Sequence, residues 1–466
     1  MDRLKQVGTV KPRHSRTIGH SKIGLGFEKL DRDVFDPEKA YDRVAEVGVK
    51  WIRIQSGWAR TERERGVYDF RWLDSIVDNL LSRGLQPWMC LCYGNGLYDE
   101  AAAKVFGAVG CPPIKTDEQR RAWHDYVAAV TSRYQGKILY YEVWNEPDGG
   151  WCWKHGPDGR EYGEFVIATA QAIRLGDPKA RVIAGSMCLP DMAWLSAVAA
   201  TGALACSDAL TYHEYSEDET RSFERVRVLR SFCRKFNPDI QIIQGESGSQ
   251  SRSDGAGALR GMAWTPLRQA KQLLRHTLAD LLADVEFLSY FSCMDMIEAL
   301  NGTVGDKSSY LDYGYFGILG ADFDADGRST GEYTPKPSYY ALQNVSSIFC
   351  EDVKVVDLPI IGQPESSLLV GRDDKPFDLI TGGFRKPNGS SAFVYWKPTP
   401  LMTTTYDGTV TWQAAGLAGD PHLVDLMTGA IYEIPASMIR DEGNGCIRLL
   451  HLPVFDYPLL ITFGDF

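Results

Sequence analysis

The sequence of 466 residues predicts an α/β protein, namely a (β/α)8 barrel followed by an antiparallel β-sandwich. Three observations lead to this prediction. From about residue 22 to residue 348, short apolar segments alternate with longer amphipathic ones, which is typical of a parallel sheet covered on both faces. Eight such pairs occur, as a closed barrel requires. After residue 350 only short alternating segments remain, separated by Gly, Pro and Asp, and this favours a sandwich.

Eight apolar segments of the first 350 residues have the length and composition of buried strands. They are residues 23–27, 49–54, 85–92, 138–144, 181–186, 209–213, 240–248 and 285–291. Helical periodicity marks the segments between them, at 37–47, 72–81, within 117–134, 162–175, within 219–236 and 267–282, and a last helix begins at 336–342. A doubly wound open sheet is the alternative arrangement, and the count of eight favours the barrel.

The chain is too long for one ordinary core, so we expect more than one domain. We predict an N-terminal segment at 1–21 that packs on the sandwich, a catalytic barrel at 22–350 and an accessory β-sandwich at 351–466. The long loop at 292–335, after the last barrel strand, is rich in Gly, Asp and Tyr. Loops of this length are functional or disordered.

The net charge of −11 argues against nucleic acid or an anionic membrane as a partner, because binding phosphates needs a basic surface. No apolar segment approaches the length of a membrane span. The first residues are polar and lack the apolar core of a signal peptide, so we expect a cytoplasmic protein, or a secreted one if a leader has been removed. The sequence does not predict an oligomeric state.

Two glutamates end predicted strands on opposite sides of the expected barrel. Glu146 directly follows the strand at 138–144, and Pro147 prevents that strand from continuing. Glu246 lies near the end of the segment 240–248. Active sites of (β/α)8 barrels lie at the carboxyl ends of the strands, and two carboxyls about 5–5.5 Å apart there suit retaining glycoside hydrolysis. Glu146 would donate the proton, favoured by aromatic neighbours, and Glu246 would be the nucleophile.

Other polar and aromatic side chains at or just after the strand ends are candidates for substrate binding. They are Arg53, Asn145, His213, Tyr215, Trp151, Trp153, Asp295, Trp58 and Asn95. A metal-dependent hydrolase would need clustered His and Asp ligands at these ends, and only His213 qualifies. The ten cysteines include no Cys-x-x-Cys pair. We therefore predict neither a metal nor a cofactor.

The segment Trp144-Asn145-Glu146-Pro147, together with Glu246, resembles the signature of clan A glycoside hydrolases over residues 22–348. The resemblance implies that Arg53 hydrogen-bonds the nucleophile region and that Asn145 binds the 2-hydroxyl beside the cleaved bond. It also implies that the strand-six segment 212–215 contacts the nucleophile and the sugar.

The segments 316–318, 336–337 and 339–340 are similar to members of glycoside hydrolase family 39. That family includes β-xylosidases and α-L-iduronidases, which also carry a β-sandwich. The chain departs from many clan members at strand eight, where the segment 290–295 contains no tryptophan.

These features predict a retaining glycosidase that cleaves an equatorial glycosidic bond and acts from the end of an oligosaccharide, like a β-xylosidase. The long loops after strands four and eight favour such exo action because they would enclose a pocket. One alternative is an endo-acting glycanase of the same clan, which would need an open cleft. Another is a catalytically silent carbohydrate-binding barrel, against which both acids argue. The sequence does not identify the sugar or the linkage.

Overall fold

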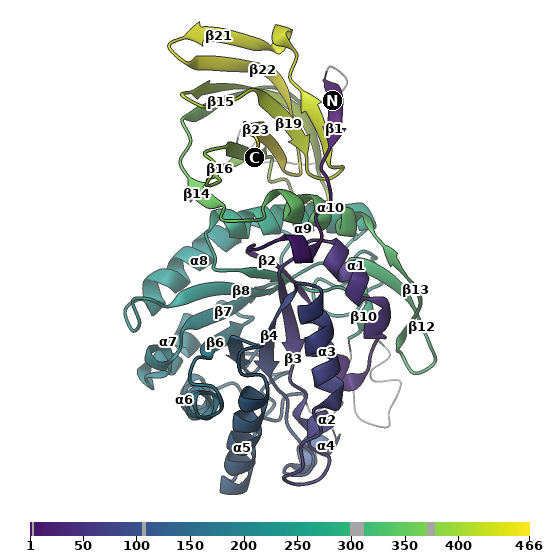
Figure 1. Ribbon diagram of the computed structural model, residues 1–466, viewed down its shortest axis with the longest axis vertical. Helices are drawn as coiled ribbons and strands as arrows, with labels where there is room; N and C mark the ends of the chain where they lie inside the picture. The colour runs from purple at the N-terminus through teal and green to yellow at the C-terminus, as the bar shows by residue number, and fades with distance from the viewer. Residues whose placement is uncertain (2–3, 105–108, 299–311, 371–377) are drawn as a thin grey trace.

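The computed structural model describes residues 1, 4–104, 109–298, 312–370 and 378–466. Two domains follow one another along the long axis of the molecule, with the barrel below and the sandwich above in Figure 1. Residues 299–311 of the predicted long loop lie outside the described residues. In the described chain no helix combines the length and the apolar character that a membrane crossing requires.

Eight parallel strands close into a barrel, which confirms the predicted fold class and excludes the open sheet. They are β2 (Ile23–Gly26), β3 (Trp51–Gln55), β4 (Gln86–Leu91), β5 (Tyr140–Val143), β6 (Arg181–Met187), β7 (Ala209–Glu214), β8 (Gln241–Ser247) and β9 (Leu288–Tyr290). Closure comes from β9 pairing with β2, for example Leu25 beside Tyr290.

Large side chains fill the amino-terminal half of the barrel interior. This cluster consists of Trp88, Tyr140, Ile183, Ala209, Ile243 and Phe287, with Trp51 stacked on Phe287 at 4.4 Å. A filled interior leaves space for chemistry only at the carboxyl ends of the strands.

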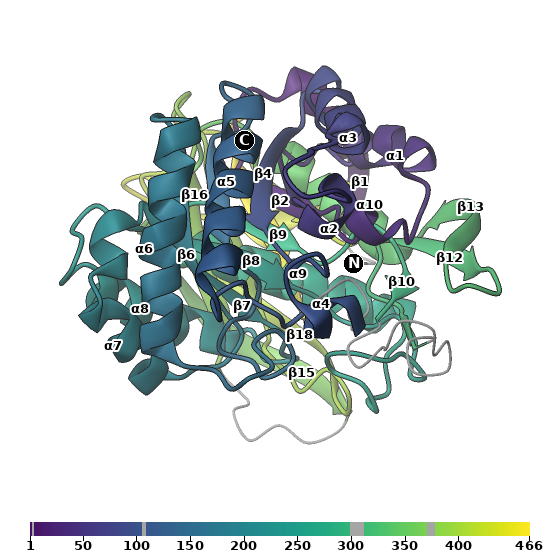
Figure 2. The same cartoon turned by 90° about the horizontal axis from the view of Figure 1, so that it is seen from below.

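Helices surround the strands, as Figure 2 shows. The helices near the predicted positions are α1 (Tyr41–Glu46), α3 (Arg71–Ser82), α5 (Asp117–Arg133), α6 (Gly159–Gly176), α8 (Thr220–Cys233), α9 (Pro266–Leu282) and α10 (Pro337–Ile348). Thr116 and Thr265 cap α5 and α9, where each side chain accepts a backbone N–H. The sequence did not indicate α7 (Met192–Ala200), because its composition is almost uniformly apolar and shows no helical period.

Two antiparallel sheets form the sandwich. The larger has the order β1-β20-β19-β23-β17-β16-β14 and the smaller β15-β18-β22-β21. Their bounds are β1 (Lys5–Thr9), β14 (Lys354–Val356), β15 (Ile360–Val370), β16 (Ile380–Arg385), β17 (Ser391–Trp396), β18 (Thr405–Ala415), β19 (Pro421–Asp425), β20 (Ala430–Glu433), β21 (Ile439–Gly443), β22 (Cys446–Phe455) and β23 (Leu459–Phe463). The N-terminal strand β1 thus belongs to this domain, paired with β20.

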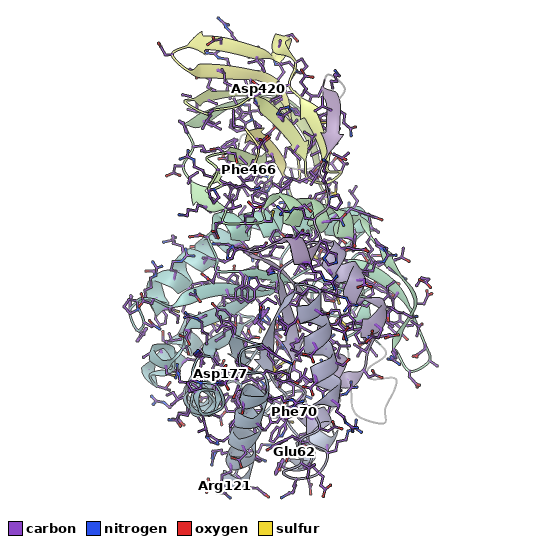
Figure 3. The ribbon with its side chains drawn as sticks, viewed as in Figure 1. Glu62, Phe70, Arg121, Asp177, Asp420 and Phe466 are labelled. Carbon is purple, nitrogen blue, oxygen red and sulfur yellow. The ribbon has the colours of Figure 1, made fainter. Side chains whose placement is uncertain are left out.

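Buried polar contacts join the sandwich to α9 and to the loop before α8. Glu219 of that loop accepts from Trp396 Nε1 of β17 (2.7 Å) and pairs with Arg275 of α9 (2.7 Å). Arg275 also donates to the backbone oxygen of Thr399 (2.9 Å). Figure 3 marks the sandwich by Asp420 and the barrel by Asp177, with the last residue, Phe466, on the side of the sandwich nearer the barrel. These contacts connect the sandwich to the barrel through buried side chains.

The loop after β9 contains four short strands among its described residues. They are β10 (Met296–Ile297), β11 (Tyr313–Gly314), β12 (Leu319–Phe323) and β13 (Ser329–Pro335). The hairpin of β12 and β13 projects from the barrel (Figures 1 and 2), while the segment around β10 borders the cavity described next. Two short helices, α2 (Trp58–Thr61) and α4 (Glu100–Lys104), follow β3 and β4.

Candidate active site

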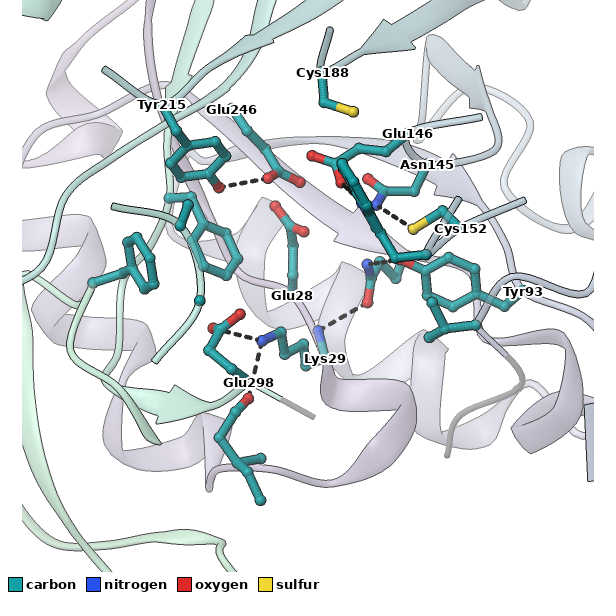
Figure 4. Close-up of a pocket in the computed structure, with 18 of the residues that line it drawn as sticks. Glu28, Lys29, Tyr93, Asn145, Glu146, Cys152, Cys188, Tyr215, Glu246 and Glu298 are labelled. Atoms are coloured by element: carbon teal, nitrogen blue, oxygen red, sulfur yellow. Dashed lines mark hydrogen bonds and ion pairs between the residues drawn. The ribbon is translucent and has the colours of Figure 1, made fainter. Parts of the chain in front are cut away.

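A cavity of about 480 Å³ opens at the carboxyl ends of the barrel strands. This volume is typical of a small-molecule site. Four acids line it, Glu28, Glu146, Glu246 and Glu298, together with aromatic side chains and two thiols. Figure 4 shows Glu146 and Glu246 on facing walls. Both predicted acids therefore face one cavity.

Glu146 follows β5 at a sharp turn in the backbone. Trp144 and Glu146 have φ values of +69° and +46°, a region that side chains other than glycine rarely adopt. The carboxylate has two partners: Oε1 lies 2.9 Å from His213 Nδ1, and Oε2 accepts from the indole N–H of Trp151. Trp151 is about one-third exposed, so it forms part of the pocket wall. The turn thus directs the Glu146 carboxylate into the cavity, where it lies between the Trp151 indole and the His213 imidazole.

Glu246 is buried at the end of β8 and held on both oxygens. Arg53 donates to Oε1, and the Tyr215 hydroxyl donates to Oε2 at 2.6 Å. Burial works to raise the pKa of Glu246, but the charges of His213 and Arg53 and the hydrogen bond from Tyr215 outweigh it, so the pKa lies below its ordinary value. The side chain is therefore held as a carboxylate, the form that a nucleophile needs.

Arg53 is fully buried at the barrel mouth and contacts three carboxylates. Besides Glu246, its guanidinium donates to Glu142 Oε2 (2.5 Å from Nη2) and to Glu28 Oε2 (2.9 Å from Nη1). It also donates to the amide oxygen of Asn145 at 2.8 Å. The planar fork of arginine suits such multiple recognition. Arg53 therefore fixes Glu246 relative to Asn145, on the neighbouring wall.

His213 lies between the two candidate catalytic acids. Its Nδ1 is 2.9 Å from Glu146 Oε1 and 3.6 Å from Glu246 Oε2, and its Nε2 is 3.0 Å from the Ser186 hydroxyl. Burial works to lower the pKa of His213, but Glu246 and Glu146 outweigh it and raise the pKa above the ordinary value. The two carboxylates therefore favour the protonated form of the ring, whose Nδ1 faces Glu146.

The separation of the acids determines what chemistry is possible. One oxygen of Glu146, one oxygen of Glu246 and a ring nitrogen of His213 all lie within 4.8 Å of one another. Retaining enzymes place the two carboxyls about 5–5.5 Å apart, whereas inverting enzymes leave about 6.5–9.5 Å for a water. The geometry suits direct attack by one acid while the other moves a proton.

Among the described residues, the donor atoms of Glu146, His213 and Glu246 are close enough together to hold a metal ion. Their other contacts disfavour a cation there. The guanidinium of Arg53 touches Glu246, and the proton that His213 carries would have to leave before the ring could bind a metal. A proton-transfer site explains these contacts better.

The structure brings some of the predicted binding residues to the cavity and leaves others away from it. Asn145, Tyr215 and Trp151 line it, and Arg53 and His213 lie behind the two acids. Four others are buried elsewhere, namely Trp58, Trp153, Asn95 and Asp295.

For these four, the expectation of a place in the pocket wall is corrected by their contacts. Trp58 stacks on Tyr126 and Tyr98, and Asn95 donates to the backbone oxygen of Glu62 at 2.9 Å. The indole of Trp153 donates to Glu161, a residue of α6 (2.9 Å). Asp295 is ion-paired with Lys336 at 2.6 Å and accepts from Gly317 N at 2.9 Å. These four side chains therefore stabilise the fold and do not line the cavity.

Sequence reasoning missed several residues of the site. Glu28 and Glu142 contact Arg53, and Lys29 pairs with Glu298 at 2.9 Å in the lining of the cavity. Alternation along the strands was the available signal. Glu142 lies two residues after Tyr140, which points into the barrel, so it points inward as well. Cys152 and Cys188 also line the cavity, and nothing in their sequence context marked them.

A (β/α)8 barrel that presents two facing glutamates at its carboxyl end has the architecture of a retaining glycosidase. Residues 1–200 match the sequence model of the glycosyl hydrolases family 39. A beta-xylosidase of Geobacillus stearothermophilus is 24% identical over 198 residues, which cover 38% of this chain and 37% of that protein. A beta-galactosidase of Clostridium cellulovorans is 26% identical over 149 residues, or 28% and 22% of the two chains. The chain thus spans less than two fifths of the length of these curated relatives.

Solved structures resemble nearly the whole chain. A family 39 glycoside hydrolase from Bacteroides cellulosilyticus has a TM-score of 0.65 at 16% identity, covering 95% of this chain and 81% of that one. A family 39 beta-xylosidase from Caulobacter crescentus has a TM-score of 0.57 at 17% identity, covering 99% and 98%. At these identities the likeness shows the fold. The resemblance to family 39 predicted from the motifs is confirmed, because the first 200 residues match the family model and the fold is similar to that of family 39 structures.

Proposed function

We propose that the protein is a retaining glycoside hydrolase in which Glu146 is the acid/base and Glu246 the nucleophile. The observation that carries the proposal is the approach of the two carboxylates to within 4.8 Å, on facing walls of one cavity. Their surroundings also differ as the two roles require. Glu246 is held ionised by Arg53 and Tyr215, while Glu146 shares a proton with His213.

In the first step, an oxygen of Glu246 attacks the anomeric carbon of the bound sugar as the bond to the leaving oxygen breaks. The proton that Glu146 and His213 share passes from the Glu146 carboxyl to that oxygen, so the aglycone leaves as a neutral alcohol. The sugar is then joined to Glu246 as an ester. Charge is lost from Glu246 as the ester forms, and Arg53 remains paired with Glu142.

In the second step, a water molecule takes the place of the aglycone. Glu146, now ionised, accepts a proton from that water as its oxygen attacks the anomeric carbon. The ester bond breaks and Glu246 returns to its ionised form, bonded to Arg53 and Tyr215. Two inversions at one carbon give net retention of the anomeric configuration.

For the substrate we propose a glycoside with an equatorial bond that is cleaved from the chain end, of the β-xyloside kind. Support for end-on binding comes from the cavity wall, where the Lys29–Glu298 ion pair and Trp151 flank the two acids. Asn145 lies beside both acids, where its amide can bind the 2-hydroxyl of the sugar. The partial match to a Geobacillus beta-xylosidase supports the same class.

An endo-acting glycanase of the same clan is the second candidate. A solved structure named as a family 30 endoxylanase, from Clostridium papyrosolvens, has a TM-score of 0.56 at 12% identity to this chain. Endo action would need subsites on both sides of the acids, and the Lys29–Glu298 pair in the cavity wall disfavours an extended chain on its side. A silent binding barrel would have no need for a proton shared between Glu146 and His213.

A panel of nitrophenyl glycosides (β-xyloside, β-glucoside, β-galactoside, α-arabinoside and an iduronide analogue) tests the proposal. Proton NMR of the first product formed should show the anomeric configuration of the substrate. Glu146→Gln should lose most turnover of the poorest leaving groups, while Glu164→Gln, an exposed glutamate of α6, should match the wild type. Inversion of configuration would contradict the retaining assignment. Faster cleavage of internal bonds in xylohexaose than of its end would favour the endo alternative.

A further inference from the structure

Glu28 is a third carboxyl in the cavity that the two-acid mechanism does not use. It follows β2, continues the inward-facing alternation of Gly24 and Gly26, and is only 2% exposed. It lines the cavity, and Figure 4 shows its carboxyl group directed toward the side that holds Glu246. A buried acid beside a nucleophile needs a physical explanation, because burying an ionised carboxylate costs free energy unless it is fully paired.

The two oxygens of Glu28 have different surroundings. Oε2 accepts from Arg53 Nη1 at 2.9 Å. Oε1 is buried and has no hydrogen-bond partner among the described residues. A Cβ atom at Gly26 would come within 2.9 Å of Oε1, so the glycine makes room for this oxygen. One oxygen is therefore fixed by the protein, while the other is left without a partner in a residue that lines the cavity.

The local charges do not balance if every carboxyl is ionised. Arg53 already contacts Glu142 and Glu246, and a third carboxylate on the same guanidinium leaves negative charge in excess. His213 supplies one further positive charge, which is shared with Glu146 and Glu246. A proton on one of the acids reduces this excess of negative charge. Glu28 is the acid with the fewest donors, so it is the natural position for that proton.

Charged and titratable groups reach Glu28 from every element around it. They are Arg53 on β3, His213 on β7, Glu246 on β8, Arg32 after β2, Tyr215 after β7 and Cys293 after β9. Burial is the largest effect on the pKa of Glu28 and raises it. Glu246 adds to the rise, Arg53 and His213 oppose it, and the pKa reaches about 8.

We propose that Glu28 is a substrate-binding carboxylic acid, protonated in the active enzyme, whose Oε1–H donates a hydrogen bond to a hydroxyl of the sugar beside the nucleophile. This inference rests on the proposed function, since it assigns a ligand to the same cavity. A neutral acid matches the cavity in two ways. It donates where a carboxylate could only accept, and it adds no charge that would repel the attacking Glu246.

Glu28→Gln tests the proposal because glutamine has the same shape, stays neutral at every pH and can still donate. The assay is kcat/KM from pH 5 to 9.5 on the dinitrophenyl glycoside of whichever sugar the panel identifies. That leaving group needs no proton from an acid, so proton donation does not limit the alkaline side of the profile. At pH 6 the variant should stay within about threefold of the wild type.

The ratio of wild type to Glu28→Gln isolates Glu28 from every other titrating group. It should fall about tenfold between pH 6 and pH 9, because an acid with a pKa of about 8 is about nine-tenths ionised at pH 9. Glu28→Ala should lose about tenfold or more at every pH, mainly through KM, because it lacks the donor. Glu62→Gln, a buried acid outside the cavity, should keep the wild-type profile. A ratio that does not change with pH, or equal losses in the glutamine and alanine variants, would overturn the proposal.

Chemical unfolding provides a readout that does not depend on activity. The pKa of Glu28 is about 8 in the folded protein, above the ordinary value of 4.5, so the folded state binds more protons between these values. The free energy of unfolding of the wild type relative to Glu28→Gln should therefore fall as pH rises from about 4.5 to about 8, and level off beyond. A flat difference would show Glu28 to be ionised and would refute the inference. If no glycoside is cleaved, the proposed function fails, and this comparison still decides the protonation.

Discussion

The hydroxyl of Tyr215 offers a sharp test of how the nucleophile is held. It donates to Glu246 Oε2 at 2.6 Å, the length of a charge-assisted O–H···O⁻ bond. Tyr215→Phe removes that bond and keeps the ring, which packs edge-on against Phe316 at 5.8 Å. Hydrogen bonds to charged groups contribute about 1.5–3 kcal/mol, and each 1.36 kcal/mol is tenfold in rate. We expect kcat/KM to fall by about ten- to a hundredfold.

The same variant should also shift the pH dependence of kcat/KM in a defined direction. The bond from Tyr215 helps to hold the pKa of Glu246 below its ordinary value, so losing the bond raises that pKa. A nucleophile with a higher pKa takes up a proton sooner as the pH falls. The acid limb of kcat/KM should therefore move to higher pH in the variant.

Kinetics on the dinitrophenyl glycoside from pH 4 to 8, with the stability of each variant measured in parallel, provide the assay. Tyr41→Phe is the matched control, because Tyr41 is buried and its hydroxyl has no hydrogen-bond partner among the described residues. The reasoning is refuted if Tyr215→Phe keeps kcat/KM within twofold and leaves the acid limb in place.

Three further predictions concern the contacts around the acids and between the domains. Arg53→Gln leaves buried carboxylates without their cation and should lower the free energy of unfolding by about 3–5 kcal/mol in urea titrations; an unchanged midpoint would contradict this. Trp151→Phe removes the donor to Glu146 and should lower kcat by about five- to tenfold, most for poor leaving groups, whereas an equal loss for all leaving groups would place its role elsewhere. Trp396→Phe removes the bond to Glu219 and should lower the free energy of unfolding by about 1–3 kcal/mol, and an equally stable variant would show that the junction does not depend on it.

Strand position was the strongest information in the sequence. The eight apolar segments lie where the strands are, and Glu146 and Glu246 face the cavity because the ends of parallel strands meet at one mouth. The position of a residue just after a strand does not show whether its side chain points into the cavity. Trp151 and Trp153 are two residues apart, yet one borders the cavity and the other is buried against α6.

Pairing between distant segments was not predictable from the sequence. Asp295 follows the last barrel strand, as a site residue would, but Lys336 neutralises it from 41 positions later in the chain. The three carboxylates on Arg53 also come from separate strands, and their convergence depends on the register of the closed barrel. Alternation along β2 and β5 indicates that Glu28 and Glu142 point inward, and only the assembled barrel shows that they share one cation.

The most direct test of the central claim is chemical rescue of the nucleophile variant. Glu246→Ala removes the carboxylate and leaves space at the anomeric carbon, and azide can enter that space. On the dinitrophenyl glycoside, the variant alone should be inactive, and azide should restore turnover with a glycosyl azide of inverted anomeric configuration as the product. Near-normal activity without azide, or rescue that yields the retained azide, would contradict the assignment of Glu246 as nucleophile.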